Sequence, residues 1–428
     1  MREKELILYR DFEEGRLLED MAWLMAEYNN EYYNLEDKQA LGYDCISALI
    51  DFATAHGFYG NIWHCYIANL LVNSENAYST SCEIVGNIEG TLNDAALHDF
   101  EIIREFICYD FSDMGNTLSL HTFGLVENYA APKTAGKVYN TRIRDRICET
   151  AVKLAEAKDA QEIKACMTQF YKDYGVGRFG LHKAFRVEHA EEGAVIKPIM
   201  NIQHVYLEDL VGYEIAKKKL IDNTEAFVNG KRANNCLLFG DAGTGKSSSI
   251  KGILNRYYDK GLRIIEIYKH QFHDLNDVIS QIKNRNYKFI IYMDDLSFEE
   301  FEIEYKYLKA VIEGGLEKKP NNVLIYATSN RRHLIKESFK DKEDRDEDLH
   351  TNDTVQEKLS LVARFGVTIF FSSPDKKEFR NIVKTLSERH NITMPEEELY
   401  LKANQWELAH GGLSGRTAQQ FIDYLLGQ

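Results

Sequence analysis

The chain has few prolines and no long apolar run, and each absence excludes a class of protein. Of its 428 residues only 5 are proline, while 44% are apolar and 28% are charged. This composition is typical of a soluble globular protein of two or three domains and excludes a fibrous or largely disordered chain. No uncharged apolar stretch approaches the roughly eighteen residues that cross a bilayer. The first residues also lack the apolar segment of a secretory signal, so we expect a cytoplasmic protein without a membrane partner.

Cysteine is sparse, and basic residues are scarce near the N-terminus. The 7 cysteines are scattered and form no CxxC pair, so their spacing indicates neither a zinc site nor a disulfide framework. We expect reduced, mostly buried thiols. Residues 1–115 carry 6 basic but 22 acidic side chains. Such an acidic surface repels nucleic acid, so we do not expect a nucleic-acid partner.

Three regions differ in their hydrophobic pattern. Residues 1–195 repeat apolar residues at helical spacing, which predicts a mainly α-helical N-terminal domain. Residues 196–373 alternate short apolar strands with helices, which predicts an α/β core with a five-stranded parallel sheet. Residues 374–428 contain three further helical segments, which we interpret as a helical lid. The five strands are expected at Cys236–Phe239, Arg263–Ile267, Phe289–Met293, Val323–Ala327 and Val367–Phe371.

A phosphate-binding loop (P-loop) follows the first of these strands. The sequence GDAGTGKS fits the pattern G-x-x-x-x-G-K-[ST], and it lies between a predicted strand and a predicted helix. Its glycines let backbone N–H groups converge on phosphate oxygens at a helix N-terminus. Lys246 is expected to contact the β- and γ-phosphates, and the Ser247 hydroxyl to bind Mg²⁺. The residues predicted to bind nucleotide here are Gly240, Asp241, Ala242, Gly243, Thr244, Gly245, Lys246, Ser247 and Ser248.

Polar residues end two later strands at the same expected edge of the sheet. Asp294 and Asp295 follow the strand FIIYM. Asp294 is expected to bind the Mg²⁺ directly or from its outer coordination sphere. Asp295 would then face the γ-phosphate and orient the attacking water. Asn330 ends the strand VLIYATS, where it can donate a hydrogen bond to that water or to the γ-phosphate.

These motifs, in this order, resemble those of AAA+ ATPases. The resemblance includes the segment LEDLVGYE, whose Val211 and Gly212 match the approach to the adenine pocket, and the segments ARF and SGR. It implies that Arg364 of ARF is an arginine finger, which acts on the γ-phosphate of a neighbouring subunit. It also implies that Arg416 of SGR is the sensor arginine of the lid.

More narrowly, runs such as YMDDLSFEE and NNVLIYATSNRRHL are similar to a bacterial family of uncharacterised AAA+ ATP-binding proteins, a domain of unknown function. Arg331 and Arg332 follow Asn330 directly and are alternatives to Arg364 as the finger. The resemblance implies ATP and Mg²⁺ as ligands and a homo-oligomeric ring or spiral. It leaves the protein partner, expected on the N-terminal domain, unidentified.

One residue departs from the superfamily pattern, which has Glu where this chain has Asp295. The shorter side chain withdraws the carboxylate by about 1.5 Å, one C–C bond. Misplacement on this scale can slow a reaction about a hundredfold, unless Glu299 or Glu300 substitutes. Two functions therefore stay open: a Mg²⁺-dependent ATP hydrolase that remodels or loads a protein partner, and an ATP-gated scaffold or switch with negligible hydrolysis. A nucleic-acid loader fits the acidic N-terminus poorly.

Overall fold

The computed structural model divides the chain into two compact units, Met1–His182 and Lys183–Gln428. It describes residues 2–130, 139–191, 193–200, 202–298, 304–313, 320–330, 334 and 361–427. The boundary expected after residue 195 differs from this division, because the chain after His182 forms two strands of the second unit's sheet. Within the described residues, no helix has both the length and the apolar character needed to cross a membrane.

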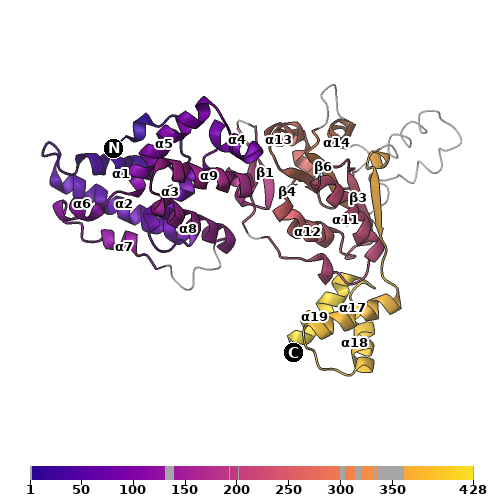
Figure 1. Cartoon of the computed structure of the whole chain (residues 1–428). Helices are drawn as coiled ribbons and strands as arrows, with labels where there is room; N and C mark the ends of the chain where they lie inside the picture. Colours follow the sequence, from indigo (N-terminus) through magenta and orange to yellow (C-terminus); the bar gives the residue numbers. More distant parts are fainter. Residues whose placement is uncertain are drawn as a thin grey trace. The chain divides into compact units, whose positions relative to one another are not determined.

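The first unit is helical (Figure 1). Several of its helices begin at an asparagine or aspartate whose side chain accepts a backbone N–H, as Asn34, Asn61 and Asp159 do. The helices are α1 (Arg16–Glu27), α2 (Leu35–His56), α3 (Ile62–Asn73), α4 (Ala77–Val85), α5 (Thr91–Ile107), α6 (Phe111–Thr117), α7 (Phe123–Glu127), α8 (Thr141–Glu156), α9 (Ala160–Tyr174) and α10 (Gly177–Leu181).

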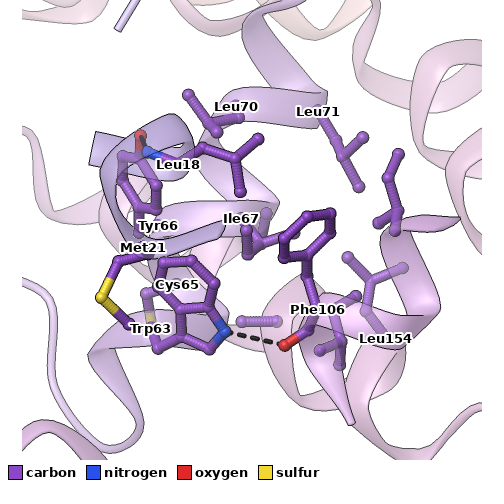
Figure 2. Close-up of a cluster of buried hydrophobic side chains, with 14 of the residues drawn as sticks. Leu18, Met21, Trp63, Cys65, Tyr66, Ile67, Leu70, Leu71, Phe106 and Leu154 are labelled. Carbon is purple, nitrogen blue, oxygen red and sulfur yellow. Dashed lines mark hydrogen bonds between the residues drawn. The ribbon is translucent and has the colours of Figure 1, made fainter. Parts of the chain in front are cut away.

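Helix α3 forms the centre of the first unit's core. Its Trp63 is fully buried, and the indole Nε1 donates a hydrogen bond to the backbone oxygen of Phe106 at 2.8 Å (Figure 2). The N-terminal segment is fixed by Asp99, whose buried carboxylate accepts the backbone N–H groups of Ile7 and Tyr9 at 2.9 and 3.0 Å. Both contacts satisfy polar groups inside an apolar interior, where an unpaired donor would destabilise the fold.

The second unit contains a seven-stranded sheet in the order β2-β1-β4-β5-β6-β3-β7. All neighbouring pairs are parallel except β1 and β2. The five predicted strands are present and parallel, but the prediction of five strands in total was too low by β1 and β2. The strands are β1 (Ala184–Ala190), β2 (Gly193–Pro198), β3 (Cys236–Gly240), β4 (Leu262–Glu266), β5 (Lys288–Met293), β6 (Val323–Ser329) and β7 (Val367–Phe371).

Helices cover this sheet, and the apolar residues of α11 and α12 pack against one of its faces. Strand β6 is buried along its whole length, as expected for a central parallel strand. Three C-terminal helices form a small cluster with its own apolar core around Phe379, Ala403 and Phe421. The helices are α11 (Glu214–Val228), α12 (Lys246–Tyr257), α13 (Leu275–Ile282), α14 (Glu304–Glu313), α17 (Lys376–Arg389), α18 (Glu396–Ala409) and α19 (Gly415–Leu426), with short 3₁₀ turns at η3 (Leu207–Asp209), η4 (Tyr258–Lys260) and η5 (Lys269–Asp274).

Candidate functional site

The phosphate loop connects the carboxyl end of β3 to the N-terminus of α12. Gly240, Gly243 and Gly245 all have positive φ angles, of 136°, 75° and 89°, which residues with a Cβ atom rarely adopt. A Cβ atom on Gly240 would also collide with the backbone oxygen of Phe371. The loop conformation therefore favours glycine at all three positions, of which the sequence pattern specifies Gly240 and Gly245.

Lys246 is the first residue of α12, at the end of the loop, and is only 6% exposed. Its ammonium group donates hydrogen bonds to the backbone oxygens of Gly240 and Asp241 at 2.9 and 2.6 Å. It also donates to Oδ1 of Asn330 at 3.0 Å. Burial lowers the pKa of Lys246, because a charged group loses its hydration. The loop thus holds a partly desolvated cation beneath its backbone amides.

Asp294 accepts three hydroxyl hydrogen bonds on a single oxygen. The donors to Oδ1 are the Ser247 Oγ at 2.8 Å, the Tyr292 hydroxyl at 2.7 Å and the Thr328 Oγ1 at 2.5 Å. Burial by itself would raise the pKa of Asp294, but these hydrogen bonds outweigh burial and hold the pKa below its usual value. The site therefore keeps Asp294 ionised and oriented toward Ser247.

Asp295 and Asn330 are held together at the same edge. Asp295 has a φ of 49°, in the left-handed region, and its backbone N–H donates to the Thr328 Oγ1 at 2.9 Å. Asn330 Nδ2 donates to Oδ1 of Asp295 at 2.7 Å. Since Asn330 also accepts from Lys246, a continuous hydrogen-bond chain connects the phosphate loop to the two carboxylates.

Helices α19 and α17 contact the phosphate loop and the turn η3, respectively. The backbone N–H of Arg416, in the first turn of α19, donates to the backbone oxygen of Gly243 at 3.1 Å. From α17, Arg389 donates to the backbone oxygens of Asp209 and Glu208 at 2.7 and 2.8 Å. These contacts enclose a cavity of about 710 Å³ between the sheet edge and α17 and α19.

Most of the predicted site residues line this cavity. The lining includes Val211, Asp294, Asp295, Asn330, Arg416 and the loop residues from Ala242 to Ser248. Gly212, Gly240 and Asp241 are not part of the lining. Gly212 has a φ of 84° where the chain turns into α11, and the Asp241 carboxylate accepts the backbone N–H of Ser373 at 2.9 Å.

Arg364 lies elsewhere. It lies three residues before the start of β7, is partly buried and is not among the residues that line this cavity. The alternative finger residues Arg331 and Arg332, and the alternative carboxylates Glu299 and Glu300, lie outside the described residues.

Two side chains that hold the candidate site together were not identified from the sequence. Thr328 connects the two acids, since its hydroxyl donates to Asp294 and accepts from the backbone of Asp295. Tyr292, in β5, donates to Asp294, which follows that strand. A signal existed for both, because alternate residues of a strand point to the same side: Tyr292 precedes Asp294 by two residues, and Thr328 precedes Asn330 by two.

The fold and the site together define the class. The phosphate-loop strand β3 lies between β6 and β7, the paired acids follow β5, and a helical lid closes on the loop. This is the arrangement of an AAA+ P-loop protein, and the predicted fold class and superfamily are confirmed.

Comparison with known families identifies the chain more narrowly. A family described as "Protein of unknown function (DUF815)" matches residues 180–428, and the chain belongs to this family. Solved structures similar to the chain include the Thermotoga maritima RuvB Holliday junction branch migration motor, with 13% identity and a TM-score of 0.33 over 52% of this chain and 72% of that chain. A variant of the same RuvB has 14% identity and a TM-score of 0.34 over the same shares of the two chains. The comparison with curated proteins found no match.

Proposed function

We propose that this protein is a Mg²⁺-dependent AAA+ ATPase that uses ATP to remodel or load a protein partner. The observation that carries the proposal is the convergence of Lys246, Ser247 and Asp294 at one edge of the sheet, inside a cavity that the lid partly encloses. A buried cation, a ring of backbone amides and a helix N-terminus are suited to the phosphates of a nucleotide. Arg416 lines the same cavity from the lid and supplies a further cation for the bound nucleotide.

The donor set fits a magnesium ion. Ser247 Oγ and Asp294 Oδ1 are both hard oxygen donors and lie 2.8 Å apart. Adjacent ligands of an octahedral Mg²⁺ ion, each at about 2.0–2.1 Å, are separated by about 2.9 Å. Bound there, the ion would neutralise charge on the β- and γ-phosphate oxygens. Tyr292 and Thr328 hold the Asp294 carboxylate in the orientation that this requires.

Hydrolysis would proceed by in-line attack of water on the γ-phosphate, for which positioning supplies most of the catalysis. In this proposal Asp295 orients the water, and Asn330 fixes the Asp295 carboxylate through its 2.7 Å hydrogen bond. Lys246 would exchange its contacts with the backbone oxygens of Gly240 and Asp241 for the phosphate oxygens. Each of these groups already lines the cavity or faces it, so little rearrangement is needed.

One observation favours a second candidate, an ATP-gated scaffold that hydrolyses ATP negligibly. The Asp295 carboxylate is engaged by Asn330 and is one carbon shorter than the Glu of the superfamily. A carboxylate that is both short and restrained reaches a water beside the γ-phosphate poorly, which would leave ATP bound but intact.

Phosphate release by the full chain decides between these two functions. We expect Mg·ATP turnover in the unmodified protein and its loss in both Asp294→Asn and Asp295→Asn, with ATP still bound by Asp295→Asn. Asp259→Asn is the matched control, because Asp259 is exposed in the 3₁₀ turn after α12, outside the cavity lining. Binding of Mg·ATP without turnover would establish the scaffold. Turnover by Asp295→Asn at the normal rate would move the water-orienting role to Glu299 or Glu300.

The proposal extends to assembly through Arg364. Because Arg364 does not line the cavity of its own chain, a catalytic role for it requires a neighbouring subunit, and a head-to-tail contact of this kind closes into a ring or continues as a spiral. In this proposal the helical first unit, which carries many acidic residues, binds the protein partner.

Light scattering after size-exclusion chromatography tests the assembly. We expect a larger species with Mg·ATP than without nucleotide, because a ligand that bridges subunits favours the assembled state. Arg364→Ala should lower the rate of hydrolysis with little change in ATP affinity or melting temperature. Arg232→Ala, at an exposed position, is the control and should leave the rate of hydrolysis unchanged. A monomer at high concentration with a non-hydrolysable ATP analogue, and activity independent of concentration, would contradict the ring.

A further inference from the structure

Three metal-binding side chains meet at the end of strand β1, although the sequence separates them widely. His189 lies near the end of β1, while His273 and Asp274 end the turn η5 that follows β4. Parallel pairing of β1 with β4 brings the two segments together. One donor atom from each side chain lies within 4.8 Å of the other two. None of the three residues lines the nucleotide cavity.

The distances match a tetrahedral metal site. The Asp274 Oδ1 lies 3.2 Å from the His189 Nδ1 and 3.4 Å from the His273 Nε2. For Zn²⁺ with ligands at about 2.0–2.1 Å, two ligands of a tetrahedron are about 3.3 Å apart. Two edges of the donor triangle therefore already have the required length. Both imidazoles are at least half exposed, with 62% and 50% of their side-chain surface accessible, so their rings can turn to complete the third edge.

The Asp274 carboxylate supplies an independent indication of a cation. Its side chain is only 6% exposed, and its Oδ2 atom is buried without a hydrogen-bond partner. Across the ranges that the structure describes, the two imidazoles are the only groups paired with this carboxylate. A buried carboxylate oxygen without a partner is costly. A metal ion held by all three residues would supply a compensating charge.

We propose that His189, His273 and Asp274 bind a divalent transition-metal ion, with Zn²⁺ as the favoured ion. Two imidazole nitrogens and one carboxylate suit zinc and its neighbours and do not suit Mg²⁺ or Ca²⁺, which take oxygen ligands. With three protein ligands on an exposed face, the fourth position is open to water or to a donor from another molecule. The ion clamps the first strand of the second unit to the turn that precedes α13.

Zinc titration of the full chain tests this proposal. The measurement is made by calorimetry in a Cys108→Ser background, because Cys108 is an exposed thiol that could bind zinc by itself. We expect His189→Ala and His273→Ala each to weaken one zinc site by at least about tenfold, because each removes a direct ligand. His270→Ala is the matched control, since His270 is an exposed histidine of the same turn outside the donor cluster. Equal zinc affinity and stoichiometry in the His189→Ala/His273→Ala double variant and in His270→Ala would overturn the proposal.

Cobalt substitution gives a readout of the coordination itself. Co²⁺ should produce intense visible absorption of a tetrahedral site in the unmodified chain and in His270→Ala, and this absorption should vanish in His273→Ala. Because both histidines are exposed, their replacement should leave the fold intact, which an unchanged melting temperature in the absence of metal would verify. A Co²⁺ spectrum equal to that of the aqueous ion in the unmodified chain would contradict the site.

Discussion

Replacing Thr328 by Val should destabilise the second unit. The Thr328 hydroxyl donates to the Asp294 carboxylate at 2.5 Å and accepts the Asp295 N–H at 2.9 Å. Thr328 is 1% exposed, so Val fills the same space but makes neither hydrogen bond.

The magnitude follows from the two hydrogen bonds. One to a charged group is worth about 1.5–3 kcal/mol, and a buried donor without a partner costs about 1–3 kcal/mol. Because this edge of the sheet faces a cavity, water can replace part of the lost hydrogen bonding. We therefore expect Thr328→Val to lower the free energy of unfolding by about 3 kcal/mol. For a unit of this size each kcal/mol lowers the melting temperature by about 2–4 °C, so Thr328→Val should lower it by about 6–12 °C.

Thr328→Ser is the control, because it keeps the hydroxyl and removes one methyl group, worth about 0.8 kcal/mol. Scanning calorimetry of the full chain measures both variants, and addition of Mg·ATP identifies the transition of the second unit as the one that shifts upward. If Thr328→Val and Thr328→Ser melt within about 2 °C of each other, the Asp294–Thr328–Asp295 network does not stabilise this edge and the reasoning is refuted.

Two further predictions concern the same site. The pKa of Asp294 lies below its usual value in the folded state, so its ionisation contributes stability above the unfolded pKa of about 3.9, and this contribution is lost as the pH falls through the folded pKa. In urea unfolding from pH 6 to 3, the free energy of unfolding should therefore fall more steeply with decreasing pH in the unmodified chain than in Asp294→Asn. Equal slopes would contradict the assignment. Gly243→Ala should weaken ATP binding, measured by calorimetry. An added Cβ atom would lie 2.9 Å from the Ser414 Oγ and 3.0 Å from the Arg416 Cβ and would displace the lid. Gly230→Ala is the control that should leave the ATP affinity unchanged, because its φ is also positive but the added Cβ meets nothing within 4 Å.

The sequence predicted the nucleotide-binding half of the second unit well because its signals are local. The loop glycines and Lys246 belong to one continuous motif, and the flanking strand and helix begin where the pattern places them. The strand β7 has its predicted bounds, Val367–Phe371. Parallel strands that are buried on both faces appear in the sequence as short apolar runs. Charged helices separate these runs along the chain, so each of these strands could be predicted.

The parts that were missed depend on contacts between distant segments. Strand β1 mixes buried and exposed residues without a regular alternation, and it joins the sheet by pairing with β4. The same pairing brings His189 to His273, which no spacing rule relates. The role of Thr328 likewise arises only when β5 and β6 lie side by side. The hydrophobic pattern of a sequence indicates the type of a single helix or strand, whereas these features arise from contacts between two such elements.

Calorimetric titration of the full chain with Mg·ATP, in parallel with Lys246→Ala, tests the central claim most directly. The account predicts one bound nucleotide per chain and a loss of affinity of at least about a hundredfold in Lys246→Ala, since this change removes a cation that would make charge-assisted hydrogen bonds worth about 1.5–3 kcal/mol each. Lys260→Ala, at an exposed lysine after the same helix, should bind as the unmodified chain does. Equal ATP affinity in Lys246→Ala and Lys260→Ala, with both variants folded, would show that the phosphate loop is not the nucleotide site.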